Sequence, residues 1–151
     1  MIKIICVGKI KEKFYTDAVN EYLKRLSKYT KIDLIEVKDE NFDDVKTLIK
    51  ERDSIIKYIN DKDYIITLEI DGNELDSVSL SNHISTLEAK YSNITFIIGG
   101  SIGIHDDIKK MSNYKLSFSK MTFPHQLFRV MLLEQLYRSY KIKNNETYHK
   151  W

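Results

Sequence analysis

Short stretches rich in β-branched and apolar residues alternate along the chain with segments in which apolar residues recur at helical spacing. The first pattern predicts strands and the second predicts amphipathic helices. The expected strands are Ile2 to Val7, Ile32 to Val37, Tyr64 to Ile70, Ile94 to Ile98 and a weaker one at Tyr114 to Phe118. The expected helices are Glu12 to Tyr29, Phe42 to Ile59, Ser77 to Tyr91, His105 to Met111 and Pro124 to Lys143.

This alternation predicts an α/β fold. Continuous apolar runs such as Ile94 to Ile98 suit strands that are covered on both faces, so we expect a mainly parallel sheet with helices on both faces. The 151 residues fit a single domain, 1–151, and no internal repeat or Pro/Gly linker divides them. Ser77, Ser79 or Ser81 is the expected N-cap of the third helix.

The last expected helix opens at Pro124, the only proline, and is apolar over much of its circumference. Its apolar residues are Leu127, Phe128, Val130, Met131, Leu132, Leu133, Leu136, Tyr137 and Tyr140. One apolar face can pack on the sheet, which leaves a second. That second face predicts either a homodimer interface or burial inside one large core.

Composition places the chain among soluble globular proteins, because 42% of the residues are hydrophobic and 30% are charged. The first residues, Met1 to Val7, lack the length and the cleavage site of a signal peptide, and no stretch reaches transmembrane length. The single cysteine, Cys6, excludes an internal disulfide and favours a reducing, cytoplasmic location. Because Cys6 lies in an expected strand, we interpret it as a buried small hydrophobe rather than a nucleophile.

The formal net charge of +2 is too small to indicate nucleic-acid binding, but its distribution is uneven. Residues 1–31 carry eight Lys/Arg against three acids, residues 32–76 carry six against fourteen, and residues 77–151 carry ten against five. The basic ends are either solvated helix faces, which counting alone favours, or a phosphate-binding surface.

A glycine-rich turn follows the expected strand at Ile94 to Ile98, in the sequence Gly99-Gly100-Ser101-Ile102-Gly103. Ligands of open α/β sheets bind beyond the carboxyl ends of strands, where glycines let the backbone approach them closely. The spacing matches neither GxGxxG nor a P-loop. The segment therefore predicts a cofactor loop, with a plain tight turn as the alternative.

A second candidate loop, Leu116 to His125, runs from a strand to a helix N-terminus, where free backbone groups can face a ligand. Met121 and Phe123 are apolar enough to flank an adenine, although a buried connection would have the same sequence character. The strand Tyr64 to Ile70 also ends close to a glycine, Gly72. The histidines His83, His105, His125 and His149 are scattered, and HExxH, CxxC and GxSxG are absent, so no metal site is expected.

Several of these segments, taken in order, resemble one family over essentially the whole chain. They are Val7-Gly8-Lys9, Glu21-Tyr22, Ile98 to Gly103, Leu116 to His125, Arg129, Glu134 to Arg138 and Tyr148-His149-Lys150. The pattern resembles the RlmH (YbeA-like) family of SPOUT methyltransferases, which methylate N3 of a pseudouridine in large-subunit ribosomal RNA with S-adenosylmethionine. The segment 38–59 is shorter than in the family, and Trp151 follows the usual ending, where it either stacks on a base or is merely exposed.

The resemblance implies an α/β sheet whose C-terminal part forms a deep trefoil knot, and a homodimer in which two subunits complete each active site. Knots are nearly absent from proteins, so spacing rules do not predict one. The S-adenosylmethionine positions that it implies are Leu68, Gly99, Phe118, Ser119, Lys120, Met121, Thr122 and Phe123. They fall at the strand ends already selected on physical grounds.

Methylation of an imide nitrogen needs a proton acceptor and a cation near the developing anion. We expect Arg138 to supply the cation, and His149 or Tyr148 from the C-terminal tail to accept the proton or position the ring. The alternatives are a helical salt bridge between Arg138 and Glu134, and a tail histidine without a role. His125 is expected to be structural, and Lys120 contacts a cofactor carboxylate, an RNA phosphate, or neither with its side chain.

The expected macromolecular partner is 23S ribosomal RNA in the assembled ribosome, because a chain with so little net charge should bind isolated RNA weakly. Two other functions remain open on the sequence. One is a catalytically inert ribosome-binding or assembly factor of the same fold, and the other is a transferase or nucleotide-binding α/β enzyme that acts on a small molecule.

Overall fold

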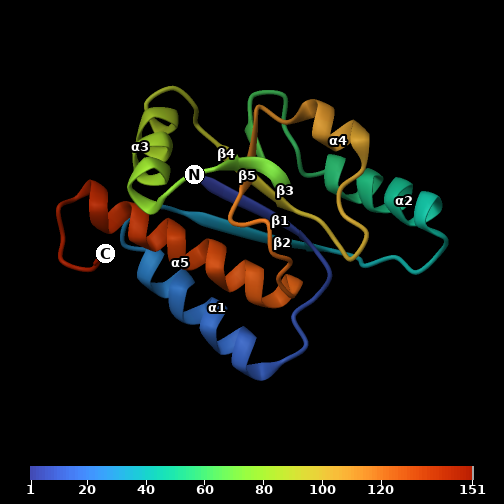
Figure 1. Ribbon diagram of the computed structural model, residues 1–151, viewed down its shortest axis with the longest axis horizontal. Helices are drawn as coiled ribbons and strands as arrows, with labels where there is room; N and C mark the ends of the chain where they lie inside the picture. The colour runs from blue at the N-terminus through green and yellow to red at the C-terminus, as the bar shows by residue number, and fades with distance from the viewer. Residues whose placement is uncertain (151) are drawn as a thin grey trace.

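A computed structural model describes residues 1–150, in which five strands alternate with five helices (Figure 1). The strands are β1 (Ile2–Val7), β2 (Ile32–Val37), β3 (Tyr64–Glu74), β4 (Ile94–Ile98) and β5 (Tyr114–Ser117). The helices are α1 (Lys13–Leu26), α2 (Asp44–Ile56), α3 (Ser77–Glu88), α4 (Asp106–Met111) and α5 (His125–Lys143). Trp151, whose role the sequence left open, lies outside the described residues.

The strands form one sheet in the order β2-β1-β4-β3-β5, and every neighbouring pair is parallel. This confirms the expected α/β class and the parallel sheet. All the carboxyl ends therefore lie along one edge of the sheet. Because β4 lies between β1 and β3, the chain leaves β3 for the interior of the sheet and then returns past β3 to reach β5.

Helices cover both faces of the sheet, as expected, because side chains of a strand point alternately to its two sides. Ile2 and Ile4 of β1 join the larger core, together with residues of α1, α3 and α5. Ile5 and Val7 join the smaller core, together with residues of α2 and α4. Figure 1 shows the same division, with α1, α3 and α5 on one side of the sheet and α2 and α4 on the other.

All five helices and β5 are shorter than expected by one to three residues at one or both ends, and two further details differ from expectation. β3 runs to Glu74 rather than Ile70, because β5 pairs with both halves of β3 across an irregularity between Leu68 and Asn73. The N-cap of α3 is Asp76, whose side chain accepts a hydrogen bond from the Ser79 backbone N–H at 2.7 Å. The expectation of a serine cap was wrong, and an aspartate has the advantage that its negative charge faces the positive end of the helix.

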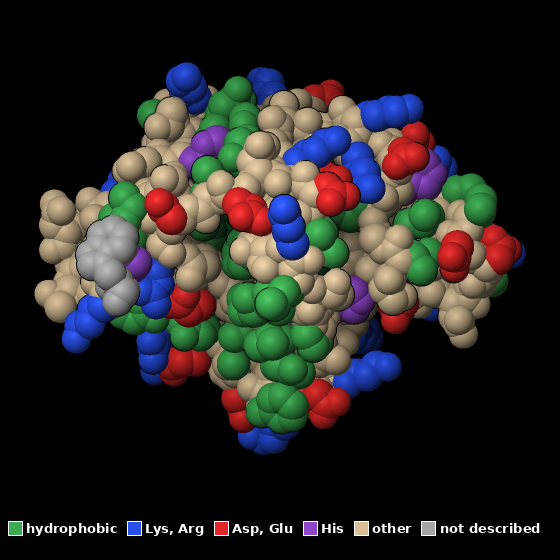
Figure 2. Space-filling view, viewed as in Figure 1, with side chains coloured by type: hydrophobic (Ala, Val, Ile, Leu, Met, Phe, Trp, Pro, Cys, Tyr) green, Lys and Arg blue, Asp and Glu red, His purple; other side chains and the backbone are tan. Residues whose placement is uncertain are grey.

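The apolar surface of α5 is used on more than one side. Leu132, Leu133 and Leu136 are fully buried in the core, and α5 packs against both α1 and α3. Even so, hydrophobic side chains gather over α1 and the first half of α5 on the face seen in Figure 2. Phe14 and Met121 are 65% and 73% exposed. Packing against α1 and α3 within one chain thus buries part of the second apolar face of α5. The homodimer stays a prediction.

Cys6 is completely buried in the larger core, and this burial raises the pKa of its thiol to about 12. A thiol that holds its proton so firmly is a poor nucleophile at neutral pH. The interpretation of Cys6 as a packing residue is confirmed. Within residues 1–150, no helix is both long enough and apolar enough to span a membrane.

Candidate functional site

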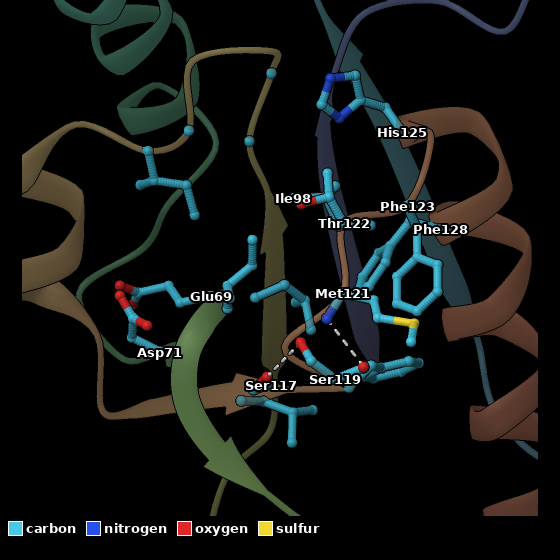
Figure 3. Close-up of a pocket in the computed structure, with 18 of the residues that line it drawn as sticks. Glu69, Asp71, Ile98, Ser117, Ser119, Met121, Thr122, Phe123, His125 and Phe128 are labelled. Atoms are coloured by element: carbon cyan, nitrogen blue, oxygen red, sulfur yellow. Dashed lines mark hydrogen bonds between the residues drawn. The ribbon is translucent and has the colours of Figure 1, made fainter.

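A cavity of about 320 Å³ opens at the carboxyl ends of β3, β4 and β5 (Figure 3). Its walls come from the middle of β3, just beyond the part that pairs with β4, from the glycine loop after β4, and from the loop that joins β5 to α5. Both loops that the sequence selected as ligand loops therefore border the same space. A cavity at this edge of a parallel sheet is the usual place for a ligand in α/β folds.

The glycine loop after β4, residues 99–103, is a tight turn closed by a backbone hydrogen bond. The Gly103 N–H donates a hydrogen bond to the Gly100 carbonyl at 3.1 Å, and Gly103 has a φ of +90°. A Cβ atom placed on Gly99 would lie 2.6 Å from the Gly103 carbonyl oxygen, closer than real Cβ atoms approach. Glycine at position 99 therefore lets the backbone fold tightly beside the cavity.

The loop between β5 and α5 forms the apolar wall of the cavity. Its shape is held by Ser117, whose hydroxyl donates to the Ser119 carbonyl at 3.0 Å, and by the Met121 N–H, which donates to the Ser119 hydroxyl at 3.0 Å. Phe118 and Phe123 pack on Phe128 of α5, with ring centroids 4.9 and 6.0 Å apart. Three aromatic rings thus offer a surface suited to a flat apolar group.

Most residues that the resemblance implied as cofactor contacts lie around this cavity. The lining includes Leu68, Gly99, Phe118, Ser119, Met121, Thr122 and Phe123. Lys120 is exposed and lies outside the lining, so its side chain does not face this space. His125, expected to be structural, does line the cavity at the first residue of α5.

Three charged residues in the lining were not selected from the sequence: Glu69, Asp71 and Lys109. The carboxylate of Glu69 accepts a hydrogen bond from the Thr67 hydroxyl at 2.6 Å, and Lys109 Nζ lies 3.8 Å from its other oxygen. Glu69 and Asp71 follow Leu68 on the strand whose end was recognised. The sequence signal for them was their position at the predicted strand end before Gly72, but only Leu68 matched the family pattern.

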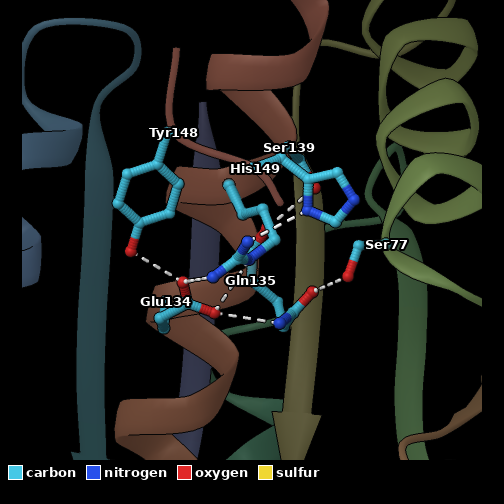
Figure 4. A network of polar contacts seen from close by, with 7 residues as sticks. Ser77, Glu134, Gln135, Ser139, Tyr148 and His149 are labelled. Atoms are coloured by element: carbon cyan, nitrogen blue, oxygen red, sulfur yellow. Dashed lines mark hydrogen bonds and ion pairs between the residues drawn. The ribbon is translucent and has the colours of Figure 1, made fainter. Parts of the chain in front are cut away.

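The residues expected to be catalytic form a separate cluster on α5 and the C-terminal tail (Figure 4). Arg138 Nη2 donates to Glu134 Oε2 at 2.8 Å, so the helical salt bridge considered as an alternative is present. Tyr148 donates its hydroxyl proton to Glu134 at 2.8 Å, and Arg138 Nη1 lies 3.0 Å from His149 Nδ1. The tail thus folds back along α5 and covers Arg138.

Burial and the bond to Glu134 both raise the pKa of Tyr148. A phenol that holds its proton this firmly is a poor proton acceptor, so of the two roles expected for Tyr148 its surroundings favour positioning. The bond to Glu134 also raises the pKa of Arg138, which stays a cation.

A second cavity, of about 640 Å³, borders this cluster and is lined by Glu134 and His149. It shares two wall residues, Leu116 and Phe118, with the first cavity. Neither Arg138 nor His149 lines the first cavity. Within one chain, the two cavities therefore adjoin at Leu116 and Phe118, and the expected catalytic residues lie outside the lining of the first cavity.

Arg129, which the resemblance also included, holds the start of α5 against the sheet. It is buried, donates to Glu36 at 2.6 Å, and donates to the Gly8 carbonyl at 3.1 Å. These bonds fix α5, and with it the loop of Phe118 to Phe123, relative to the ends of β1 and β2. Among residues 1–150, no group of three or more His, Cys, Asp or Glu is placed to hold a metal ion.

Comparisons with known proteins agree with this architecture. The profile of a family described as "Predicted SPOUT methyltransferase" matches residues 1–149. The chain is 54% identical over 157 aligned residues to the ribosomal RNA large subunit methyltransferase H of Clostridium tetani, and 50% identical to that of Clostridium kluyveri; each match covers 99% of both chains.

Two solved structures share the fold at low sequence identity. A methylase family protein from Haemophilus influenzae superposes with a TM-score of 0.59 at 12% identity, over 99% of this chain and 70% of that one. The tRNA (m1G37) methyltransferase of Aquifex aeolicus gives 0.56 at 13%, over 91% and 69%. Together with the profile match and the full-length relatives, the fold and the cavity lead to one conclusion: this chain belongs to the SPOUT methyltransferase family.

Proposed function

We propose that this protein transfers a methyl group from S-adenosylmethionine to N3 of a pseudouridine in 23S ribosomal RNA, in the cytoplasm and on the assembled ribosome. The observation that carries the proposal is the cavity at the carboxyl ends of β3, β4 and β5, which gathers seven of the eight residues expected to bind the cofactor. The names of the full-length relatives support ribosomal RNA as the substrate.

The cavity fits S-adenosylmethionine in size and chemistry. Its volume, about 320 Å³, is at the lower end of the range for small-molecule sites. The rings of Phe118, Phe123 and Phe128 suit an adenine, and the tight turn at Gly99 lets backbone groups approach it. When bound, S-adenosylmethionine supplies an electrophilic methyl group on a sulfonium.

The protein's own residues would activate and orient the pseudouridine that accepts the methyl group. The N3–H of pseudouridine must lose its proton before or during transfer. His149 accepts this proton, Arg138 stabilises the resulting negative charge on the base, and Tyr148 orients the ring. Glu134 holds both Arg138 and Tyr148 in place, with bonds of 2.8 Å to each.

A homodimer would join the two halves of the site. In one chain, Arg138, Tyr148 and His149 all lie outside the lining of the cofactor cavity. A second copy, docked through the apolar surface over α1 and α5, can bring its own tail to this cavity. The exposed Phe14 and Met121 support an interface on this side.

The trefoil knot implied by the resemblance is also part of the proposal, within a single domain of residues 1–151. The return of the chain past β3 to β5 supports it.

The proposed need for an assembled ribosome follows from the small net charge of the protein. A net charge of +2 gives little general attraction to RNA phosphates, so recognition must depend on the shape of the assembled target. Binding to a short RNA oligomer should be weak and should weaken further with salt. Tight, salt-insensitive binding to any oligomer would contradict this part of the proposal.

The test is transfer of labelled methyl from S-adenosylmethionine to intact ribosomes, to stripped ribosomal RNA and to buffer alone. We expect label only in large-subunit RNA of intact ribosomes, at N3 of a pseudouridine. Binding of the cofactor without transfer to RNA would point to another acceptor, and no binding would favour an inert ribosome-binding factor.

Two variants test the catalytic assignment in the same assay. Arg138→Ala removes the cation, and a chain that ends at Thr147 removes Tyr148 and His149. Each should lower methylation by at least about a hundredfold, the usual range for loss of a general base or an electrostatic stabiliser. Near-normal methylation by both would refute the assigned roles.

A further inference from the structure

The cofactor cavity has two chemically different ends (Figure 3). The aromatic end is formed by Phe118, Phe123 and Phe128. The acidic end is formed by Glu69, Asp71 and Lys109, two carboxylates against one ammonium. Figure 3 shows Glu69 and Asp71 across the cavity from Phe123 and Phe128.

Glu69 is held in position rather than mobile at the surface. Its side chain is only 12% exposed, and the Thr67 hydroxyl donates to its Oε2 at 2.6 Å. Thr67 is itself fixed, because it is fully buried and its hydroxyl lies 2.8 Å from the Ser112 hydroxyl. The other Glu69 oxygen, Oε1, faces Lys109 only at the long distance of 3.8 Å. This spacing leaves Oε1 with capacity to accept a further hydrogen bond.

S-adenosylmethionine has a matching polarity. Its adenosine half carries no charge at neutral pH, whereas its methionine half carries the sulfonium, one ammonium and one carboxylate. A mostly buried carboxylate favours a cationic partner, and hydrogen bonds between charged groups are about twice as strong as neutral ones. Bound the other way round, the adenine would meet two carboxylates, and the charged half would lie on three aromatic rings.

We propose that the acidic end binds the amino-acid half of S-adenosylmethionine, with Glu69 accepting hydrogen bonds from the α-ammonium and Lys109 pairing with the α-carboxylate. Asp71 adds negative charge at the rim, where it is exposed. The adenosine half then lies against the aromatic end. This inference rests on the proposed function and adds the direction in which the cofactor lies.

The test compares ligands by isothermal titration calorimetry. S-adenosylmethionine has both halves, whereas 5′-deoxy-5′-methylthioadenosine keeps the adenosine half and lacks both the amino acid and the sulfonium charge. S-adenosylhomocysteine, which keeps the amino acid on an uncharged sulfur, separates these two differences, and a loss of affinity confined to S-adenosylmethionine would assign the carboxylate to the sulfonium instead. Glu69→Gln keeps the size of the side chain and removes its charge. We expect this variant to bind S-adenosylmethionine about tenfold or more weakly and 5′-deoxy-5′-methylthioadenosine within about twofold of the wild type.

Glu74→Gln is the matched control. It removes the same charge from the same strand, but Glu74 is exposed and lies outside the cavity lining. It should leave the affinity for each ligand unchanged. Retained binding of 5′-deoxy-5′-methylthioadenosine by Glu69→Gln also shows that this variant is folded.

Two other results would overturn the inference. Equal weakening of all three ligands by Glu69→Gln would place the carboxylate at the ribose, and unchanged affinity for S-adenosylmethionine would remove it from the site. Either can occur while the proposed function stands. If the wild type binds none of the ligands, both the inference and the proposed function fail.

Discussion

Replacing Gly99 by alanine tests whether the turn after β4 shapes the cofactor cavity. The added Cβ would lie 2.6 Å from the Gly103 carbonyl oxygen, 2.7 Å from Ile104 Cγ1 and 2.8 Å from the Gly103 carbonyl carbon. Two of these atoms are backbone, so no rotamer change can relieve the contact. The loop itself has to move, and it borders the cavity.

Forcing an extra carbon into a well-packed site costs about 1–3 kcal/mol. If the loop keeps its shape, this cost lowers stability; if the loop opens, the cost appears as lost affinity. Because 1.4 kcal/mol corresponds to a tenfold change, we expect S-adenosylmethionine to bind the variant about 5- to 150-fold more weakly. Calorimetric titration measures the affinity, and urea unfolding measures the remaining cost.

Gly100→Ala is the matched control in the same loop. Its Cβ would meet Val7 Cγ1 at 3.0 Å and Glu51 Oε1 at 3.3 Å, and both atoms belong to side chains that can shift. We expect a loss of affinity several times smaller than for Gly99→Ala. If Gly99→Ala binds the cofactor as tightly as the wild type and is equally stable, the turn does not shape the cavity.

Two further predictions concern buried charges. Burial raises the pKa of the 3% exposed Glu51, and this effect outweighs the hydrogen bond from the Glu40 backbone N–H, which lowers it; the negative charges of Asp39 and Glu40 add to the rise. The folded state therefore binds the proton of Glu51 more tightly than the unfolded chain does. The free energy of unfolding of the wild type should therefore fall as pH rises from the pKa of Glu51 in the unfolded chain toward its pKa in the folded state. Urea unfolding across this pH window should show the stability of Glu51→Gln rising relative to that of the wild type. A Glu51→Gln variant less stable than the wild type at pH 7 would contradict this. Asp63 receives a 2.9 Å bond from Lys3, and these side chains are 0% and 6% exposed. Asp63→Ala should cost about 3–5 kcal/mol of unfolding free energy in urea titrations, because Lys3 stays buried without a counter-charge and keeps only its bond to the Tyr58 carbonyl. A loss below about 1 kcal/mol would refute the pairing.

The central strands β1 and β4 were predicted well because they are buried along their whole length. β1, β2 and β4 begin and end at the predicted residues, since their β-branched runs leave little ambiguity. β3 was predicted too short for a physical reason. Its last part, Asp71-Gly72-Asn73-Glu74, has no strand pattern and is ordered by pairing with β5, a partner more than forty residues away.

The site was predictable where it depends on strand ends and less so where it depends on contacts across the fold. The glycine loop and the loop before α5 could be selected because carboxyl ends of parallel strands share one edge. Glu69 was missed because an acidic residue in a predicted strand is equally compatible with a position exposed to solvent. Only the fold places it beside Lys109. The return of the tail onto Arg138 likewise joins residues that no local pattern connects.

The distance between the expected cofactor residues and the expected catalytic residues constrains the mechanism. Methyl transfer needs the acceptor nitrogen about 3–3.5 Å from the methyl carbon and in line with the breaking bond. In one chain, neither Arg138 nor Tyr148 nor His149 lines the cavity, and Leu116 and Phe118 border both the cavity and the neighbouring one beside the tail. Moving Phe118 would break its packing on Phe128, a ring that also contacts Phe123, and so disturb the wall expected to hold the cofactor. A tail supplied by a second copy needs no such movement, and for that reason we expect methylation to fall with any change that separates the subunits while cofactor binding is retained.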